Sequence, residues 1–260
     1  MIKYATRASF VTSLSALCLG AVLLVGCATP TVTPPSEEEK NALAEASLAS
    51  AVYTETLLGR CERVGPDLKS LARDLRLMWM TEHGDLLAGA DTQYSLSLAN
   101  ETLDYSGHAM ALSAVRFLHH HQSRAEKTLR LHERSPENRR LVCERELNNV
   151  ERELNQPLVE QDDTERAALI RRILIAQAER PVTLEDVPTL ALQIPGQQPP
   201  GRSYRALESR WLSECEDGML LVIANEWPHE AYGAFCDSSE TGAPSGPRFV
   251  TCEWGECDSL

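Results

Sequence analysis

The stretch from residue 57 to residue 78 reads LLGRCERVGPDLKSLARDLRLM, and its apolar pattern decides the fold. Apolar side chains recur here at alternating spacings of four and three residues, which is typical of a helical-bundle or coiled-coil seam. The seam consists of Leu57, Cys61, Val64, Leu68, Leu71, Leu75 and Met78. Gly65-Pro66 interrupts it, so the sequence predicts either a kink or two helices at this point. The helical pattern is expected to end near His83-Gly84.

The segment before this seam predicts a helix that follows a short tether. Residues 27–36 contain three prolines, which favour an extended spacer over a packed element. The next residues, Ser36-Glu37-Glu38-Glu39, have the form of a capping box, and their acidic side chains suit the positive end of a helix dipole. A helix is therefore expected to begin at residue 37.

Three more helices are predicted downstream. The second spans about Asp91 to Glu133, the third begins at Ser135-Pro136, and the fourth is capped by Asp162-Asp163-Thr164-Glu165. Each helix has an expected buried face. In the second helix it consists of Leu98, Tyr105, Ala109 and Leu112, and in the third of Cys143, Leu147, Val150 and Leu154. In the fourth it consists of Ala167, Ile170, Leu174 and Ala178. Antiparallel helices joined by short loops predict a mainly α fold, with a helical bundle over residues 37–180.

The remainder of the chain predicts a linker and a second, smaller unit. Residues 181–202 contain five prolines, so they are expected to form a linker or a strap. Residues 203–260 contain a helix-like segment, Tyr204–Leu212, and a β-like run, Met219–Ile223. This composition predicts a small α+β module.

The cysteines predict three disulfides. Of the eight cysteines, Cys18 lies in an apolar N-terminal segment and Cys27 is set aside for the reason given below. Cys61 and Cys143 lie on the seams of two helices, so they are expected to pair, which stabilises the fold by about 4 kcal/mol in the chain-entropy model. The other four, for which three pairings are possible, are expected to form two bridges within the C-terminal module: Cys215, Cys236, Cys252 and Cys257. A zinc site is the weaker alternative because the chain has no C-x-x-C pair.

The N-terminus has the layout of a secretory signal. Residues 1–26 contain Lys3 and Arg7, no acidic residue, and an apolar run from Phe10 to Val25. This run is shorter than the roughly 20 apolar residues that a membrane-spanning helix needs. A cleaved signal peptide is therefore expected in preference to a retained anchor.

The end of this signal, Leu24-Val25-Gly26-Cys27, resembles the lipobox of bacterial lipoproteins. The resemblance covers the signal alone, and it implies that the Cys27 thiol receives a diacylglyceryl group and that Cys27 becomes the first residue after cleavage. Two or more acyl chains anchor a protein stably to a bilayer. Ala28 follows in place of the Asp that favours inner-membrane retention in this family, so the resemblance implies an outer-membrane lipoprotein that faces the periplasm.

The charge of the chain disfavours nucleic acid as a partner. The chain has 38 acidic and 25 basic side chains, a net charge of −13, and nucleic-acid binding needs a basic surface. From Ser203 onward, eleven acidic and three basic side chains give a net charge of −8. A basic partner of the C-terminal module is therefore conceivable, and no cofactor is expected.

The histidines are the most crowded ionisable group. Five of the seven fall within the predicted second helix, where Asp104, His108 and His119 share one stripe. Such a stripe suggests a weak copper or zinc site, but His108 and His119 are about 16 Å apart along a helix axis, which is too far to share one ion. Structural or surface histidines are the simpler interpretation.

The C-terminal module suggests two further kinds of site. Residues 226–230 read EWPHE, which suggests the acid–base groups His229 and Glu230 near an aromatic platform, as in carbohydrate binding, although a packed turn explains the same residues. Acidic side chains of the module also suggest a calcium site, although they lack the spacing of an EF-hand loop. They are Asp237, Glu240, Glu253, Glu256 and Asp258.

The sequence therefore favours a non-enzymatic binding or scaffold role in an envelope complex, by analogy with lipoproteins of secretion and pilus systems. Two alternatives stay open. One is a metal-binding or stress-sensing lipoprotein that uses the histidine-rich segment. The other is an envelope hydrolase with its site in the C-terminal module.

Overall fold

The structure is a computed structural model that describes residues 33–105, 108–158, 164–178, 199–215, 217–236 and 247–258. The signal segment with its lipobox-like residues, most of the tether and most of the Pro-rich segment lie outside the described residues. The fold is mainly α, with a helical bundle and a small disulfide-bonded α+β module, as the sequence predicts. Both belong to one compact unit, Pro35–Leu260.

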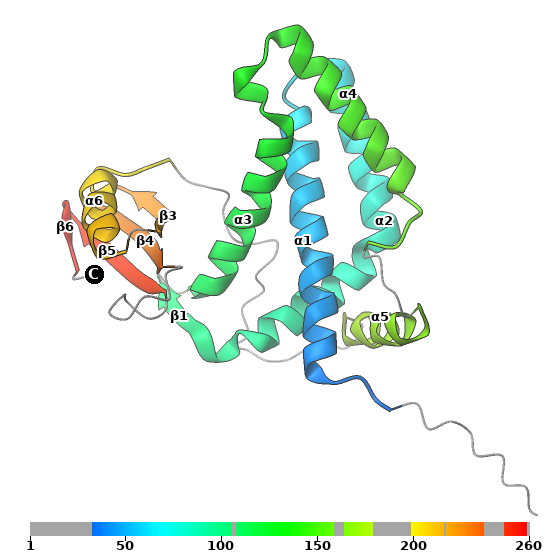
Figure 1. The fold of residues 1–260 in the computed structure, drawn as a ribbon, viewed down its shortest axis with the longest axis horizontal. Coiled ribbons are helices and arrows are strands. Elements are labelled where there is room, and N and C mark those ends of the chain that lie inside the picture. Colours follow the sequence, from blue (N-terminus) through cyan, green and yellow to red (C-terminus); the bar gives the residue numbers. More distant parts are fainter. Residues whose placement is uncertain are drawn as a thin grey trace, which may run out of the picture. The chain divides into compact units, whose positions relative to one another are not determined.

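Helices α1 (Glu37–Cys61) and α2 (Pro66–Ser97) form a long antiparallel hairpin (Figure 1). The capping box is present, because Ser36 Oγ accepts from the Glu39 amide (3.2 Å) and Glu39 Oε2 accepts from the Ser36 amide (2.7 Å). The break at Gly65-Pro66 is a break between two helices, with Pro66 as the first residue of α2. This is one of the two outcomes that the sequence analysis leaves open.

The predicted helix end near His83-Gly84 is wrong, because α2 continues to Ser97. A single glycine inside a helix costs only about 1 kcal/mol. Beyond Gly84, the side chains of Leu86, Ala90 and Tyr94 lie in the bundle core with Leu48 of α1, and this burial outweighs the cost.

The predicted second helix over 91–133 is also wrong. The chain leaves α2 through a short 3₁₀ turn, η1 (Ala99–Glu101), and forms an antiparallel hairpin of β1 (Thr102–Tyr105) and β2 (His108–Ala111) before α3 (Leu112–Leu129) begins. The hairpin pairs Tyr105 with His108 across the Ser106-Gly107 dipeptide. Such a dipeptide is a turn signal, and it outweighs the apolar spacing on which the helix prediction rested.

The rest of the bundle consists of a second 3₁₀ turn, η2 (Leu131–Glu133), and of α4 (Pro136–Glu153) and α5 (Thr164–Ala178). Ser135 Oγ caps α4 by accepting from the Asn138 amide (3.4 Å). Contact between α5 and α2 is close, since a Cβ atom built on Gly89 would lie 1.9 Å from the Leu174 carbonyl oxygen. Only glycine therefore fits at position 89.

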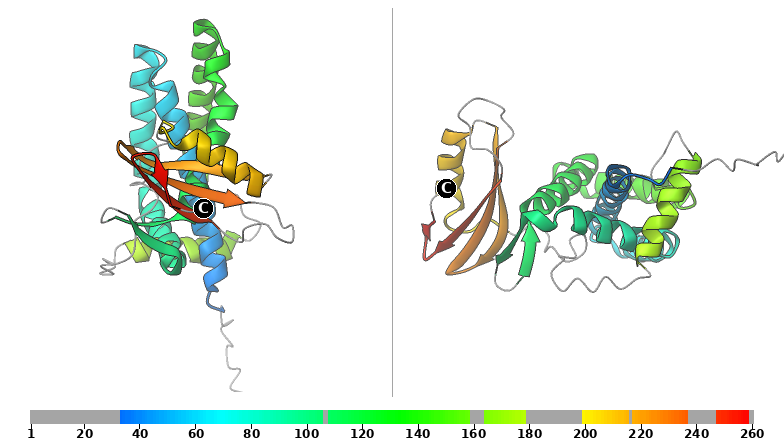
Figure 2. Two further views of the ribbon diagram at one scale, coloured as in Figure 1. Left: turned by 90° about the vertical axis from the view of Figure 1, so that its left-hand side faces the viewer. Right: turned by 90° about the horizontal axis from the view of Figure 1, so that it is seen from below.

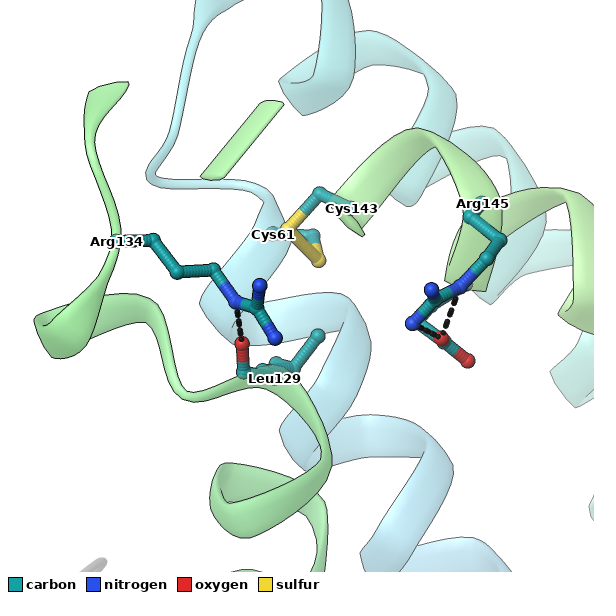
Figure 3. Close-up of a disulfide and its surroundings, with 6 residues drawn as sticks. Cys61, Leu129, Arg134, Cys143 and Arg145 are labelled. Carbon is teal, nitrogen blue, oxygen red and sulfur yellow. Dashed lines mark hydrogen bonds and ion pairs between the residues drawn. A yellow bond between two sulfur atoms is a disulfide. The ribbon is translucent and has the colours of Figure 1, made fainter. Parts of the chain in front are cut away.

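The expected disulfide between Cys61 and Cys143 joins the end of α1 to α4 (Figure 3). Both cysteines are fully buried in an aliphatic cluster with Leu129 and Leu147. Next to the bridge, Arg134 Nε donates to the Leu129 carbonyl oxygen (2.8 Å), which fixes the turn after α3. The bridge thus closes a loop between residues 82 positions apart in the sequence.

The C-terminal module contains α6 (Tyr204–Glu214) and an antiparallel sheet in the order β3-β4-β5-β6, with bounds Gly218–Glu226, His229–Cys236, Arg248–Glu253 and Glu256–Cys257. Helix α6 lies against one face of the sheet (Figure 2). This face buries Tyr232 and Val250 against Trp211 of α6. The other face buries Phe235 in a cluster that includes Leu112 of α3.

The four C-terminal cysteines pair as Cys215–Cys236 and Cys252–Cys257, which selects one of the three possible pairings. The first bridge joins the end of α6 to the end of β4, and the second joins β5 to β6. No helix in the described part of the chain is long and apolar enough to cross a bilayer.

Candidate functional site

Two exposed tryptophans lie next to each other at one end of the C-terminal sheet. Trp227 occupies the β3–β4 turn and Trp254 the β5–β6 turn, with 43% and 68% of their surfaces exposed. Their ring centroids are 5.8 Å apart, and the ring planes meet at 85°. We call this pair the aromatic tip.

The β5–β6 turn holds Trp254 in a fixed place. Trp254 and Gly255 are the two residues of a tight hairpin loop, with φ angles of 55° and 91°. Positive φ at both positions is the requirement of a type I′ turn. The Cys252–Cys257 disulfide lies directly behind the loop, and the Trp254 amide donates to the Pro228 carbonyl oxygen of the neighbouring turn (3.0 Å). The two turns are therefore joined by a hydrogen bond as well as by ring contact.

A buried carboxylate supports the other tryptophan. Glu230 is 1% exposed and accepts from the Arg202 amide (2.8 Å), the Ser203 amide (3.1 Å) and the Tyr232 hydroxyl (2.7 Å). Burial by itself raises the pKa of Glu230, but the bonds from Tyr232, Ser203 and Arg202 outweigh it, and the pKa is lowered. By holding the Arg202 backbone, Glu230 also positions the Arg202 guanidinium, which lies 4.4 Å from the centroid of the Trp227 ring.

A row of polar side chains runs across the sheet beside the aromatic tip. Glu226 pairs with His229, His229 with Glu253, and Glu253 with Glu256. Directly paired residues point to the same face of a sheet, so these four side chains share one face. All four are exposed. We call Glu226, Glu253 and Glu256 the acidic row.

The hydrolase hypothesis placed His229 and Glu230 in one site, and the structure does not bring them together. They are consecutive residues of β4 and point to opposite faces of the sheet. His229 is exposed, whereas Glu230 is buried with both carboxylate oxygens accepting hydrogen bonds. Glu230 therefore holds the module together, and the geometry gives it no acid–base role.

The histidine stripe is not present. His108 lies in β2, whereas His119, His120 and His121 lie in α3, so the helical spacing between His108 and His119 does not apply. His119 is half-buried, and burial lowers its pKa. It lines a pocket of about 230 Å³ together with Tyr204, whose hydroxyl is already bonded to Glu208 (3.0 Å).

Among the described residues, no three or more His, Cys, Asp or Glu side chains are placed so that they could hold one metal ion. Two of the acidic residues considered for calcium, Glu253 and Glu256, belong to the acidic row, while Asp258 accepts a hydrogen bond from the Thr251 hydroxyl. Asp237 and Glu240 lie outside the described residues.

Sequence reasoning found Trp227 but missed Trp254 and Arg202. A signal for Trp254 was present, because a Trp-Gly dipeptide between the paired Glu253 and Glu256 and inside a cysteine pair is consistent with a disulfide-closed hairpin. Arg202 had no such signal, since its position depends on Glu230 across 28 residues of sequence.

Comparison with known proteins adds no further assignment. No protein-family model matches the chain, and searches of curated proteins and of solved structures give no significant match.

Proposed function

We propose that this protein is a lipid-anchored lipoprotein of the bacterial outer membrane, facing the periplasm, that acts as a non-enzymatic binding or scaffold component of an envelope complex. The lipobox-like residues 24–27 and the Pro-rich tether support the anchoring. The observation that carries the binding role is the aromatic tip. Tryptophan is enriched among the residues that dominate binding energy, and large aromatic rings clustered on a surface are typical of interaction sites.

The backbone at Trp254 strengthens this proposal. A side chain other than glycine in the left-handed region costs roughly 1–2 kcal/mol, and a bulky one is rarely found there. At Trp254 the fold accepts this cost at a site where the side chain is 68% exposed and so gains little from burial. Such a residue is better explained by contact with a partner than by stability of the chain itself.

Lipid anchoring is tested by metabolic labelling of cells that express the full chain with an alkyne-bearing palmitate. We expect label on the wild-type protein and on Cys18→Ser, and none on Cys27→Ser. Cys18 is the matched control because it lies in the same signal region. Label that persists on Cys27→Ser would overturn the anchor assignment.

Partner binding is tested with a photo-crosslinking amino acid placed at Trp254 in intact envelopes. The control carries the same group at Leu77, which is 69% exposed on α2. We expect a discrete crosslinked product from position 254 that is absent from position 77. The same product from both positions, or none from position 254, would contradict binding through the aromatic tip.

A further inference from the structure

The surroundings of the aromatic tip define the chemistry of a ligand that would fit it. The acidic row places three exposed carboxylates on one face of the sheet, at the end where the two turns carry Trp227 and Trp254. Glu226 directly precedes Trp227 in the sequence, and Glu253 directly precedes Trp254. A ligand that touches the rings therefore lies next to negative charge.

The tip already binds one cation of its own chain. The guanidinium of Arg202 lies 4.4 Å from the centroid of the Trp227 ring, within the range of a cation–π contact. Its backbone is held there by the buried Glu230. This contact shows directly that the tip accommodates a guanidinium against an aromatic face.

The angle between the rings also favours a cation. The rings of Trp227 and Trp254 meet at 85°, so they form two walls of a corner. Aromatic walls at an angle surround a cation in the way that aromatic cages do, and attraction to the ring faces holds it. A sugar ring, in contrast, stacks best on one flat exposed aromatic face. Two perpendicular rings do not form a larger flat face of this kind.

We propose that the aromatic tip and the acidic row together bind an arginine- or lysine-rich segment of a partner protein. The partner's cationic group lies against the Trp254 ring, and the acidic row pairs with neighbouring basic side chains. Long basic side chains also have apolar stems that cover aromatic surface. This inference rests on the proposed function, since it names the partner chemistry of the same surface.

The test measures binding of a fluorescent peptide of alternating arginine and glycine to the full chain in a nonionic detergent. The control peptide has citrulline in place of arginine, which keeps the shape and removes the charge. We expect the arginine peptide to bind at least about tenfold more tightly, and to bind more weakly as the salt concentration rises.

Two variants locate the binding site. Trp254→Asn creates an Asn-Gly turn, which suits the type I′ loop and keeps the hairpin, and we expect it to weaken binding about tenfold. Glu253→Gln with Glu256→Gln is expected to weaken binding about fivefold and to flatten the salt dependence. The charge-matched control, Glu151→Gln with Glu153→Gln on α4, is expected to leave binding unchanged.

Three results would overturn the proposal: equal binding of the citrulline peptide, no effect of Trp254→Asn, or binding of a chitin oligosaccharide in place of the arginine peptide. The last result would make the tip a glycan-binding surface.

The photo-crosslinking experiment distinguishes failure of the proposed binding role from failure of the cationic assignment. If crosslinking from position 254 succeeds while the arginine peptide fails to bind, the tip binds a partner and the cationic assignment alone is wrong. If both fail, the binding role itself is wrong.

Discussion

The helical bundle and the C-terminal module reach a fixed structure by different means. The bundle has two clusters of mostly aliphatic buried side chains that repeat along its helices, so each residue contributes a modest share. The module is much smaller, with a central core built around Trp211, Tyr232 and Val250. It adds two disulfides and the buried carboxylate Glu230.

Buried polar groups show the same contrast. In the bundle, the side-chain amide of Gln93 donates to Asn41 (2.7 Å) and to Glu37 (3.2 Å) and accepts from Gln177 (2.9 Å), which links α1, α2 and α5. In the module, a single carboxylate fixes the position of the chain entering α6. The comparison teaches that the bundle combines two large aliphatic clusters with one long-range disulfide, whereas the small module relies on two short-range disulfides and one buried carboxylate.

The largest expected effect tests the long-range part of the bundle. Replacing Cys61 and Cys143 by Ser opens a loop between residues 82 positions apart, which should lower the free energy of unfolding by about 4 kcal/mol in the chain-entropy model. Urea denaturation followed by helical circular dichroism measures it. The comparison variant, Cys252→Ser with Cys257→Ser, removes a bridge between residues only 5 positions apart and should lower the free energy of unfolding by about 2 kcal/mol. Equal losses from both pairs would contradict the loop-length argument.

The second prediction breaks helix contact within the bundle. Gly89→Ala places a methyl group against the Leu174 carbonyl oxygen and should destabilise the fold by about 3 kcal/mol. Gly84→Ala on the same helix meets no atom closer than 3.9 Å and should stabilise the fold by about 0.5–1 kcal/mol. Thermal unfolding of both variants gives the sign directly. A stabilising Gly89→Ala would show that α5 does not approach α2 closely.

The third prediction concerns the single carboxylate of the module. Glu230→Gln puts an amide donor against donors that now bond to a carboxylate, and should cost the module about 2 kcal/mol at pH 7. In a Trp79→Phe background the remaining tryptophans lie in the module, so their fluorescence reports on it.

The pH dependence of the same variant follows from the lowered pKa of Glu230. The stabilisation is complete above the ordinary glutamate pKa of about 4.3 and is lost as the pH falls through the lower value of the folded state. The difference between wild type and Glu230→Gln should therefore shrink as the pH falls below the ordinary glutamate pKa of about 4.3. A difference that grows on acidification would have the wrong sign for a carboxylate stabilised in its charged form.

The smallest expected effect concerns the aromatic tip. Trp254→Gly removes an exposed ring and relieves the left-handed backbone, so it should leave the stability of the module unchanged or raise it by up to about 1 kcal/mol. The same fluorescence titration measures it, with Trp211→Phe as a comparison that should destabilise, since Trp211 is fully buried. A clear loss of stability in Trp254→Gly would mean that the ring supports the fold.

The bundle was largely predictable because its signals are local or periodic. The Ser36 capping box, the Gly65-Pro66 break and the seam cysteines Cys61 and Cys143 all appear in the structure as the sequence pattern indicates. The β1–β2 hairpin was missed because a short turn signal competed with apolar spacing that also fits a helix.

The candidate site was harder to predict because its parts come from distant positions. The contact of Trp227 with Trp254 depends on strand order, and the position of Arg202 depends on Glu230. Neither relation is periodic along the chain. The opposite orientation of His229 and Glu230 follows from β4 being a strand, which the sequence analysis had not assigned.

The Cys252–Cys257 bridge links the shape of the tip to the redox state of its surroundings. In a reducing compartment these thiols stay free, and a two-residue hairpin that carries tryptophan in a left-handed conformation loses its cross-link. The reduced chain would therefore present a tip without this cross-link. Under the export that we propose, oxidation would complete the cross-linked tip only after translocation.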